Sequence, residues 1–191
     1  MTLVLLFLNK EENKTMIARK NLERKLVGQI NLPTGNVDIT DPGYDRWVAC
    51  RMRTKIAPGK YNCYAYTGID RVWGRRVWIN QIVFAEGSDA EYAEKAIADG
   101  RSWRTIGGVG VDAGLAGFFN DKPDFGDDEW NDLCEWMWSS EPHNDADEAD
   151  VYIRDFNGRD GFWTESGCGD GWYSVHAIRN NRKIVALEIR F

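Results

Sequence analysis

The sequence predicts a mainly β protein, an antiparallel sandwich or flattened barrel with two peripheral α-helices. From residue 35 onward, short runs of β-branched and aromatic residues alternate with turns that contain Gly or Pro, a pattern typical of sandwiches and barrels. Aromatic residues make up 13% of the 191 residues and include nine tryptophans, which favour strands and large contact surfaces. Two other stretches have the apolar periodicity of a helix.

The strands are expected in a regular order along the chain. Val37 and Ile39 alternate with polar residues before the turn Asp41-Pro42-Gly43. The C-terminal residues 165–191 combine a glycine-rich loop with two alternating runs that flank a polar turn at residues 180–181. Further candidate strands with β-branched or aromatic character occupy residues 47–54, 61–66, 71–85, 151–156 and 161–164. We see no repeats and no linker, which favours one domain.

Two helices interrupt this pattern. Ser88 and Glu91 have the spacing of a capping box, and the apolar face that follows them ends at Gly100. A second helix, capped by Asp127 or Asp128, is predicted by apolar residues that share one helical stripe: Trp130, Leu133, Cys134 and Met137. Residues 16–27 are mixed and basic, and we expect a short helix there.

Residues 1–15 are interpreted as a translated leader or an edge strand, and residues 16–191 as a single β-rich domain. The apolar run at residues 2–8 has no basic region before it, no small-residue cleavage site after it, and too few residues to span a bilayer. Codons for residues 10–12 can form a purine-rich ribosome-binding sequence just before Met16. We therefore expect Met16 to be the natural start, which mass spectrometry of the native N-terminal peptide tests.

Charge and cysteine usage limit the classes of partner. The formal net charge of −6 argues against nucleic acids and anionic membranes. The distribution is uneven, because residues 41–80 are basic and residues 121–150 are strongly acidic. Scattered thiols without a C-x-x-C spacing disfavour zinc and a disulfide framework, and they fit a reducing cytoplasm: Cys50, Cys63, Cys134 and Cys168.

Two glycine-rich loops, each with one aspartate, form the candidate site. Asp112 lies in the segment at residues 107–119, and Asp170 lies among the glycines at residues 167–171. Glycines let a backbone approach a ligand closely while the carboxylate is presented. If the loops adjoin, Asp112 and Asp170 together with Asp121 or Asp124 could bind Ca²⁺ or Mg²⁺ through oxygen ligands. The alternative is that Gly-Asp-Gly is a tight turn in which the aspartate caps its own backbone.

Aromatic residues near these loops are candidates for ligand contacts. Trp163, Trp172 and Tyr173 could line a cleft, although tryptophans at this density also build cores. Cys168 and His176 could form a nucleophilic pair, but a cysteine beside a glycine turn is more often a small packed side chain. The glycine runs match no phosphate-binding fingerprint. A glycine loop could still hold a phosphate through backbone N–H groups, and the basic segment at residues 46–76 could add arginines.

Several segments together resemble an uncharacterised bacterial or phage family with V-D-S-G and late G-D-G-x-Y motifs. The resemblance covers residues 35–191 and is carried by short motifs in this order: DPG at 41–43, APGKY at 57–61, GVDAG at 110–114 and SGCGDGWY at 166–173. Ala113 stands where the family has serine, so no role for that hydroxyl carries over. The resemblance implies only that Asp112, Asp170 and Tyr173 belong to the family pattern.

Two functions are carried forward from the sequence. The first is a non-enzymatic binding protein, without a cofactor, that captures a small molecule or a protein partner, such as an immunity-type or phage counter-defence sequestering protein. Its ligand contacts would be Asp112, Trp163, Asp170, Trp172 and Tyr173. The alternative is a hydrolase of a phosphoester-like bond, with Ca²⁺ or Mg²⁺ on Asp112, Asp121 and Asp170. Self-association into a homo-oligomer is a further option.

Overall fold

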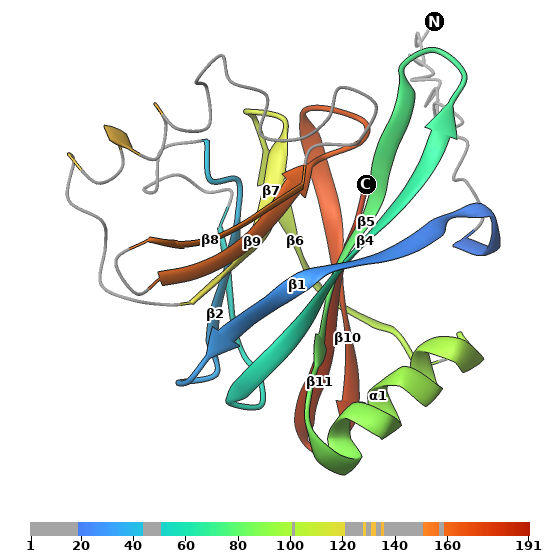
Figure 1. Cartoon of the computed structure of the whole chain (residues 1–191), viewed down its shortest axis with the longest axis vertical. Coiled ribbons are helices and arrows are strands. Elements are labelled where there is room, and N and C mark those ends of the chain that lie inside the picture. Colours follow the sequence, from blue (N-terminus) through green and yellow to red (C-terminus); the bar gives the residue numbers. More distant parts are fainter. Residues whose placement is uncertain are drawn as a thin grey trace, which may run out of the picture.

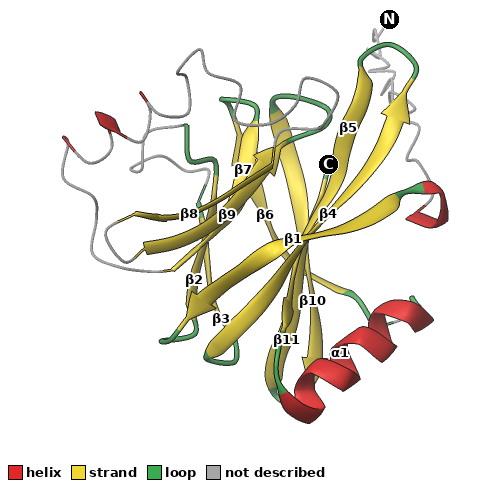
Figure 2. Ribbon diagram, viewed as in Figure 1, coloured by secondary structure: helices red, strands yellow, loops and turns green. Residues whose placement is uncertain are grey.

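The computed structural model confirms a mainly β fold with two antiparallel sheets that do not close into a barrel, as in a β-sandwich (Figures 1 and 2). It describes residues 19–43, 51–100, 102–120, 151–156 and 159–191, together with residues 128, 131, 132 and 135. Residues 1–18, 44–50, 101, 157–158 and most of 121–150 lie outside the described residues, and with them the predictions about the leader, Asp121 and Asp124.

The larger sheet has six strands in the order β1-β4-β5-β11-β10-β6. Its strands are β1 (Glu23–Leu32), β4 (Gly59–Asp70), β5 (Gly74–Phe84), β6 (Arg104–Val111), β10 (Gly171–Asn180) and β11 (Lys183–Arg190). The second sheet has five strands in the order β3-β2-β7-β9-β8. Its strands are β2 (Asn36–Thr40), β3 (Met52–Lys55), β7 (Leu115–Asn120), β8 (Val151–Phe156) and β9 (Arg159–Glu165).

The main core draws residues from both sheets. Leu187 of β11, Phe118 of β7 and Phe162 of β9 are fully buried members of one apolar cluster. Asn80 of β5 adds a polar tie, because its Nδ2 donates to the Ala116 carbonyl of β7 at 2.9 Å. Burial of apolar surface is the main term that favours folding, so the shared core joins the sheets into one unit.

One helix, α1 (Gly87–Asp99), packs on the outer face of the six-stranded sheet at one end of the molecule (Figure 1). It ends at Gly100 in a left-handed conformation, as predicted. The capping box is wrong, because the helix begins one residue before Ser88 and its N-cap, Glu86, makes no side-chain cap. Asp89 in the first turn instead accepts a hydrogen bond from Asn180 Nδ2 at 2.7 Å, which ties the helix to the β10–β11 hairpin.

The short helix expected at residues 16–27 is wrong. Only Arg19–Asn21 form a helical turn, a 3-10 turn, and β1 begins at Glu23. The apolar stripe of the second predicted helix lies outside the described residues. Four residues of the same region are described, and all four are helical: Asp128, Asn131, Asp132 and Glu135. The described part of the chain holds no helix with the length and apolar character that crossing a membrane requires.

Candidate functional site

The two Gly-Asp loops lie side by side at one end of the sandwich. Gly171 at the start of β10 pairs with Val111 at the end of β6, so Asp170 and Asp112 occupy the same end of this strand pair. The backbone N–H of Ser166 donates to the Gly114 carbonyl at 2.8 Å and joins the loops directly. Both carboxylates are exposed. The structure therefore brings together the two aspartates that the sequence singled out.

Asp41 fixes the first loop. Its carboxylate is buried, and its Oδ2 accepts the backbone N–H of Asp112 at 2.9 Å and of Ala113 at 2.7 Å. Its Oδ1 also accepts the N–H of Gly43 at 2.9 Å, which closes the turn of the DPG segment. Burial raises the pKa of Asp41, and these backbone donors oppose the shift. Asp41 thus explains why the DPG and VDAG segments occur together: one is the cap of the other.

Tyr173 fixes the second loop. Its ring is buried edge-on against Phe191, with 5.2 Å between ring centroids, and its hydroxyl donates to the Gly169 carbonyl at 2.7 Å. The Ser166 hydroxyl donates to the same carbonyl at 2.6 Å. Burial, and after it the nearby Cys168, raises the pKa of Tyr173 to about 12. Since its hydroxyl is already engaged with the loop, the structure supports an anchoring role for Tyr173.

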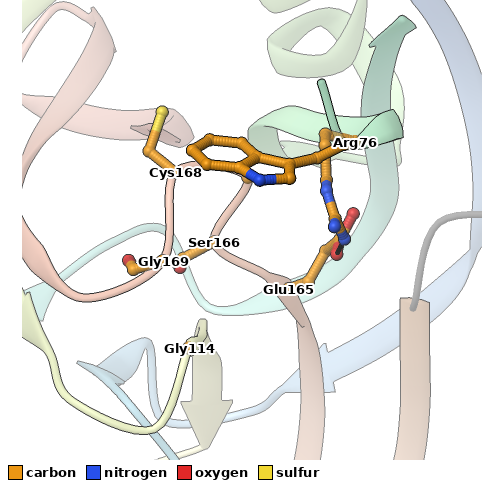
Figure 3. A pocket seen from close by; sticks show the side chains of 8 residues that line it. Arg76, Gly114, Glu165, Ser166, Cys168 and Gly169 are labelled. Carbon is orange, nitrogen blue, oxygen red and sulfur yellow. Dashed lines mark hydrogen bonds and ion pairs between the residues drawn. The ribbon is translucent and has the colours of Figure 1, made fainter. Parts of the chain in front are cut away.

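A pocket of about 240 Å³ lies between these loops and the β4–β5 hairpin. Its lining comes from the hairpin and from both loops: Trp73, Arg76, Gly114, Glu165, Ser166, Gly167, Cys168 and Gly169. Figure 3 shows the Arg76 side chain directed toward the Glu165 carboxylate, with Ser166, Cys168 and Gly169 on the neighbouring loop. Arg76 Nη1 donates to Glu165 Oε2 at 2.6 Å, and Glu165 Oε1 accepts the Val77 N–H at 3.2 Å. The wall of the pocket therefore contains a directly hydrogen-bonded ion pair, Arg76–Glu165, whose charges cancel.

Trp73 gives the pocket an exposed aromatic wall. Its side chain is 59% exposed although it lines the pocket. The turn that carries it is held by Asp70, whose Oδ1 accepts the N–H groups of Val72 at 2.7 Å and Trp73 at 3.0 Å. These two donors lower the pKa of Asp70. The indole is thus presented on an ordered hairpin rather than on an unsupported loop.

The other predicted aromatic residues lie elsewhere. Trp172 is 67% exposed and its indole lies over Gly108 of the neighbouring strand β6. Trp163 is fully buried and stacks on Phe119 and Tyr152, with ring centroids 5.6 Å and 5.5 Å apart. This layer occupies the face of β9 opposite Phe162. Trp163 is therefore a packing residue in this structure, whereas Trp172 is open to solvent.

The candidate metal ligands and the candidate Cys168–His176 pair can be judged by their positions in the fold. Among the residues that the structure describes, no group of three or more His, Cys, Asp or Glu side chains is placed to hold a metal ion, and Asp121 lies outside them. Cys168 lines the pocket, while the His176 ring lies on the sheet face, with Nδ1 3.2 Å from Thr105 Oγ1. Burial, and after it the nearby Arg190, lowers the pKa of His176.

A second polar cluster, which the sequence reading missed, crosses the outer face of the six-stranded sheet. Glu188 is fully buried and accepts hydrogen bonds from Arg19 Nη1 at 2.9 Å, Gln81 Nε2 at 3.1 Å and Arg190 Nε at 2.6 Å. The other Arg19 nitrogen, Nη2, donates to Tyr66 at 2.6 Å. The signal for this cluster was a charged residue within the otherwise apolar run of β11. The buried carboxylate of Glu188 is compensated by arginines and hydrogen-bond donors of the same cluster. Such an arrangement is typical of a network that stabilises the fold.

Sequence reasoning also missed the pocket partners of the loops. Trp73, Arg76 and Glu165 were read as parts of strands and turns, and nothing in their spacing indicates that a hairpin folds against a loop almost ninety positions later. Asp41 was read only as a turn residue. The available signal was that the DPG turn and the VDAG segment each contain an aspartate two positions before a glycine, which does not reveal a contact between them.

The comparisons with known proteins place the chain in a family. No curated protein and no solved structure gives a significant match to it. The model of the DUF4241 family, described as a protein of unknown function, matches residues 30–189. This match agrees with the resemblance to an uncharacterised family that the sequence motifs carried. The chain therefore belongs to the DUF4241 family.

Proposed function

We propose that this chain is a binding protein that captures a small molecule in the pocket between the β4–β5 hairpin and the two Gly-Asp loops. The observation that carries the proposal is the exposed indole of Trp73 on the wall of a pocket whose opposite side is a glycine-rich loop. Concave sites with an aromatic wall and a few polar groups are the usual form of small-molecule sites. A sequestering protein of the immunity or phage counter-defence type is the biological role that this proposal favours.

The support for binding is that the pocket is built in advance. Asp41 holds the first loop, Tyr173 and Ser166 hold the second, and Asp70 holds the turn that carries Trp73. A ligand that enters such a pocket orders few additional groups, so more of the contact energy remains as affinity. A low cost of ordering on binding favours tight retention of a ligand, which is the task of a sequestering protein.

Native mass spectrometry of protein purified gently from a bacterial lysate tests the proposal directly. We expect a small organic mass that is retained with and without chelator. Trp73→Ala should lose this mass, because it removes the aromatic wall, whereas Trp172→Ala should keep it, since Trp172 is equally open to solvent but does not line the pocket. Loss of the mass in both variants would place the ligand elsewhere, and a bare mass in the parent protein would favour a protein partner.

A metal-dependent hydrolase of a phosphoester-like bond is the second candidate. The observation that favours it is the position of Asp112 and Asp170 at the same end of the β6–β10 pair, both exposed. Carboxylate oxygens are suitable ligands for Ca²⁺ or Mg²⁺, and Asp121 would supply the third. The same mass spectra separate the two candidates. A divalent ion that is lost on chelation, and is absent from Asp112→Asn, would replace the first proposal with this one.

A further inference from the structure

We infer that the pocket takes a planar, uncharged heterocycle of about the size of a nucleobase, as a free base or a nucleoside without phosphate. This inference rests on the proposed function and narrows it to a ligand class. Three properties of the pocket lead to it: an aromatic wall, the absence of a net charge on the ion pair that lines it, and a small volume.

The aromatic wall selects a flat ring. Trp73 is more than half exposed at the pocket, so its indole offers a broad apolar surface to a ligand. Flat heterocycles stack on indole regardless of their detailed substitution, since each has a π-face. The loop on the other side carries no side chains at Gly167 and Gly169, so the second face of a flat ligand can approach its backbone closely.

The charges of the site disfavour an anionic ligand. Arg76 is the cation in the pocket lining, and it is paired with Glu165 at 2.6 Å. The two loops also carry the exposed carboxylates of Asp112 and Asp170 close by. A phosphate would need an uncompensated arginine or a set of convergent backbone donors, and it would meet these acids instead. An anion is therefore disfavoured. Because the carboxylate that lines the pocket, Glu165, is already paired with Arg76, the described lining does not select a cation either, and we expect an uncharged ligand.

The size of the pocket limits the ligand to a small ring system. A volume of about 240 Å³ limits the ligand to a base with little attached to it.

Isothermal titration calorimetry with a panel of free bases, nucleosides and nucleoside monophosphates tests this inference. We expect at least one base or nucleoside to bind and its monophosphate to bind more weakly. Trp73→Ala should weaken binding roughly ten-fold or more, the size of effect seen when a stacking aromatic is removed. Trp172→Ala is the matched control and should bind like the parent protein.

Other outcomes overturn the inference in distinguishable ways. A monophosphate that binds as tightly as its nucleoside would refute the charge argument. Binding that Trp172→Ala weakens as much as Trp73→Ala would place the ligand outside the pocket. A retained small molecule that is charged or not planar, seen by native mass spectrometry, would refute the ligand class and leave the proposed function standing. If no panel member binds and no small molecule is retained, both proposals fall.

Discussion

Tyr173 shows how one buried hydroxyl organises the candidate site. It belongs to the late G-D-G-x-Y segment, and the sequence suggested that it contacts a ligand. In the structure its hydroxyl donates to Gly169, so its contribution is to hold the loop that forms one side of the pocket. Asp41 has the corresponding task for the first loop, through the N–H groups of Asp112 and Ala113. The glycine-rich segments of this chain and the DPG turn thus include the supports of the site as well as its exposed aspartates.

Tyr173→Phe tests this anchoring role. Loss of the hydrogen bond to Gly169 should lower the free energy of unfolding by about 1 kcal/mol at neutral pH, measured by urea denaturation. The native pKa is raised from 10.0 to about 12, so the folded protein holds the phenol proton more tightly than the unfolded chain. The stabilisation is therefore complete below pH 10 and is lost as the pH rises toward 12.

The difference in stability between parent and Tyr173→Phe should shrink across that interval. Comparing the two proteins removes the contribution of Tyr61, whose pKa is also raised by burial. A difference that stays constant between neutral pH and pH 12 would show that the Tyr173 phenol titrates normally. In that case it would not be anchored by its hydroxyl.

At the scale of elements, alternation in the sequence predicts the strands but not which of their faces is covered. Trp163 and Trp172 both occur in short aromatic runs, and both looked like ligand contacts. The first is buried in an aromatic stack on β9, and the second is exposed on β10. In a strand, neighbouring side chains point to opposite faces of the sheet. Which of these faces is buried depends on tertiary packing, which the alternation does not reveal. For the same reason the sequence could not place Trp73 and Glu165 in the lining of one pocket.

Glu188 shows a second limit at this scale. The run at the end of the chain reads as a buried strand, and β11 is one. A glutamate in such a run must find cationic partners, yet local sequence does not reveal them. One partner, Arg19, comes from the segment where a short helix was expected, and the other, Arg190, follows two positions later. The mixed residues at 16–27 suggested a helix. The start of β1 in this region is instead stabilised by pairing with β4, which lies far away in the sequence and which local pattern does not reveal.

The loop between β9 and β10 provides a prediction at the scale of an element. Gly167 and Gly169 both have positive φ angles, of 42° and 79°, where side chains are strained. A Cβ atom at Gly167 would also meet the Val77 carbonyl oxygen, whereas open space surrounds Gly169. We expect Gly169→Ala to lower the free energy of unfolding by about 1 kcal/mol and Gly167→Ala by more, about 3 kcal/mol, in urea denaturation.

The order of the two substitutions is the critical result. Because both remove glycine from the same loop, the change in unfolded-chain entropy is common to them and cancels in the comparison. Equal losses would mean that the contact between Gly167 and β5 does not constrain the loop. The pocket would then lack the rigid side that the proposed function requires.

For the whole molecule, composition correctly predicts a globular domain with a core, whereas the net charge and the cysteines give predictions about partners and location that the fold does not test. The balance of apolar and charged residues fits a globular domain, and the structure has a continuous core. The net charge of −6 still predicts that nucleic acids and anionic membranes are not partners, and the scattered cysteines still predict a cytoplasmic location. Charge and composition do not encode a specific self-complementary surface, so they do not predict whether the protein forms a homo-oligomer.

The shared core predicts that the two sheets unfold together. Residues from β1, β4, β5, β6, β10 and β11 lie in the same buried cluster as residues from β2, β7 and β9, so neither sheet has a separate core in that cluster. Far-UV circular dichroism and tryptophan fluorescence should therefore report one coincident urea transition. Leu187→Ala in the six-stranded sheet and Phe118→Ala in the five-stranded sheet should each shift that single transition, by roughly 3 kcal/mol, because each leaves a cavity. Leu26→Ala, at a residue 55% exposed, is the control and should change stability little. If Phe118→Ala splits the transition while Leu187→Ala does not, the five-stranded sheet is a separate cooperative unit, and the Gly114 loop beside the pocket belongs to the less stable part.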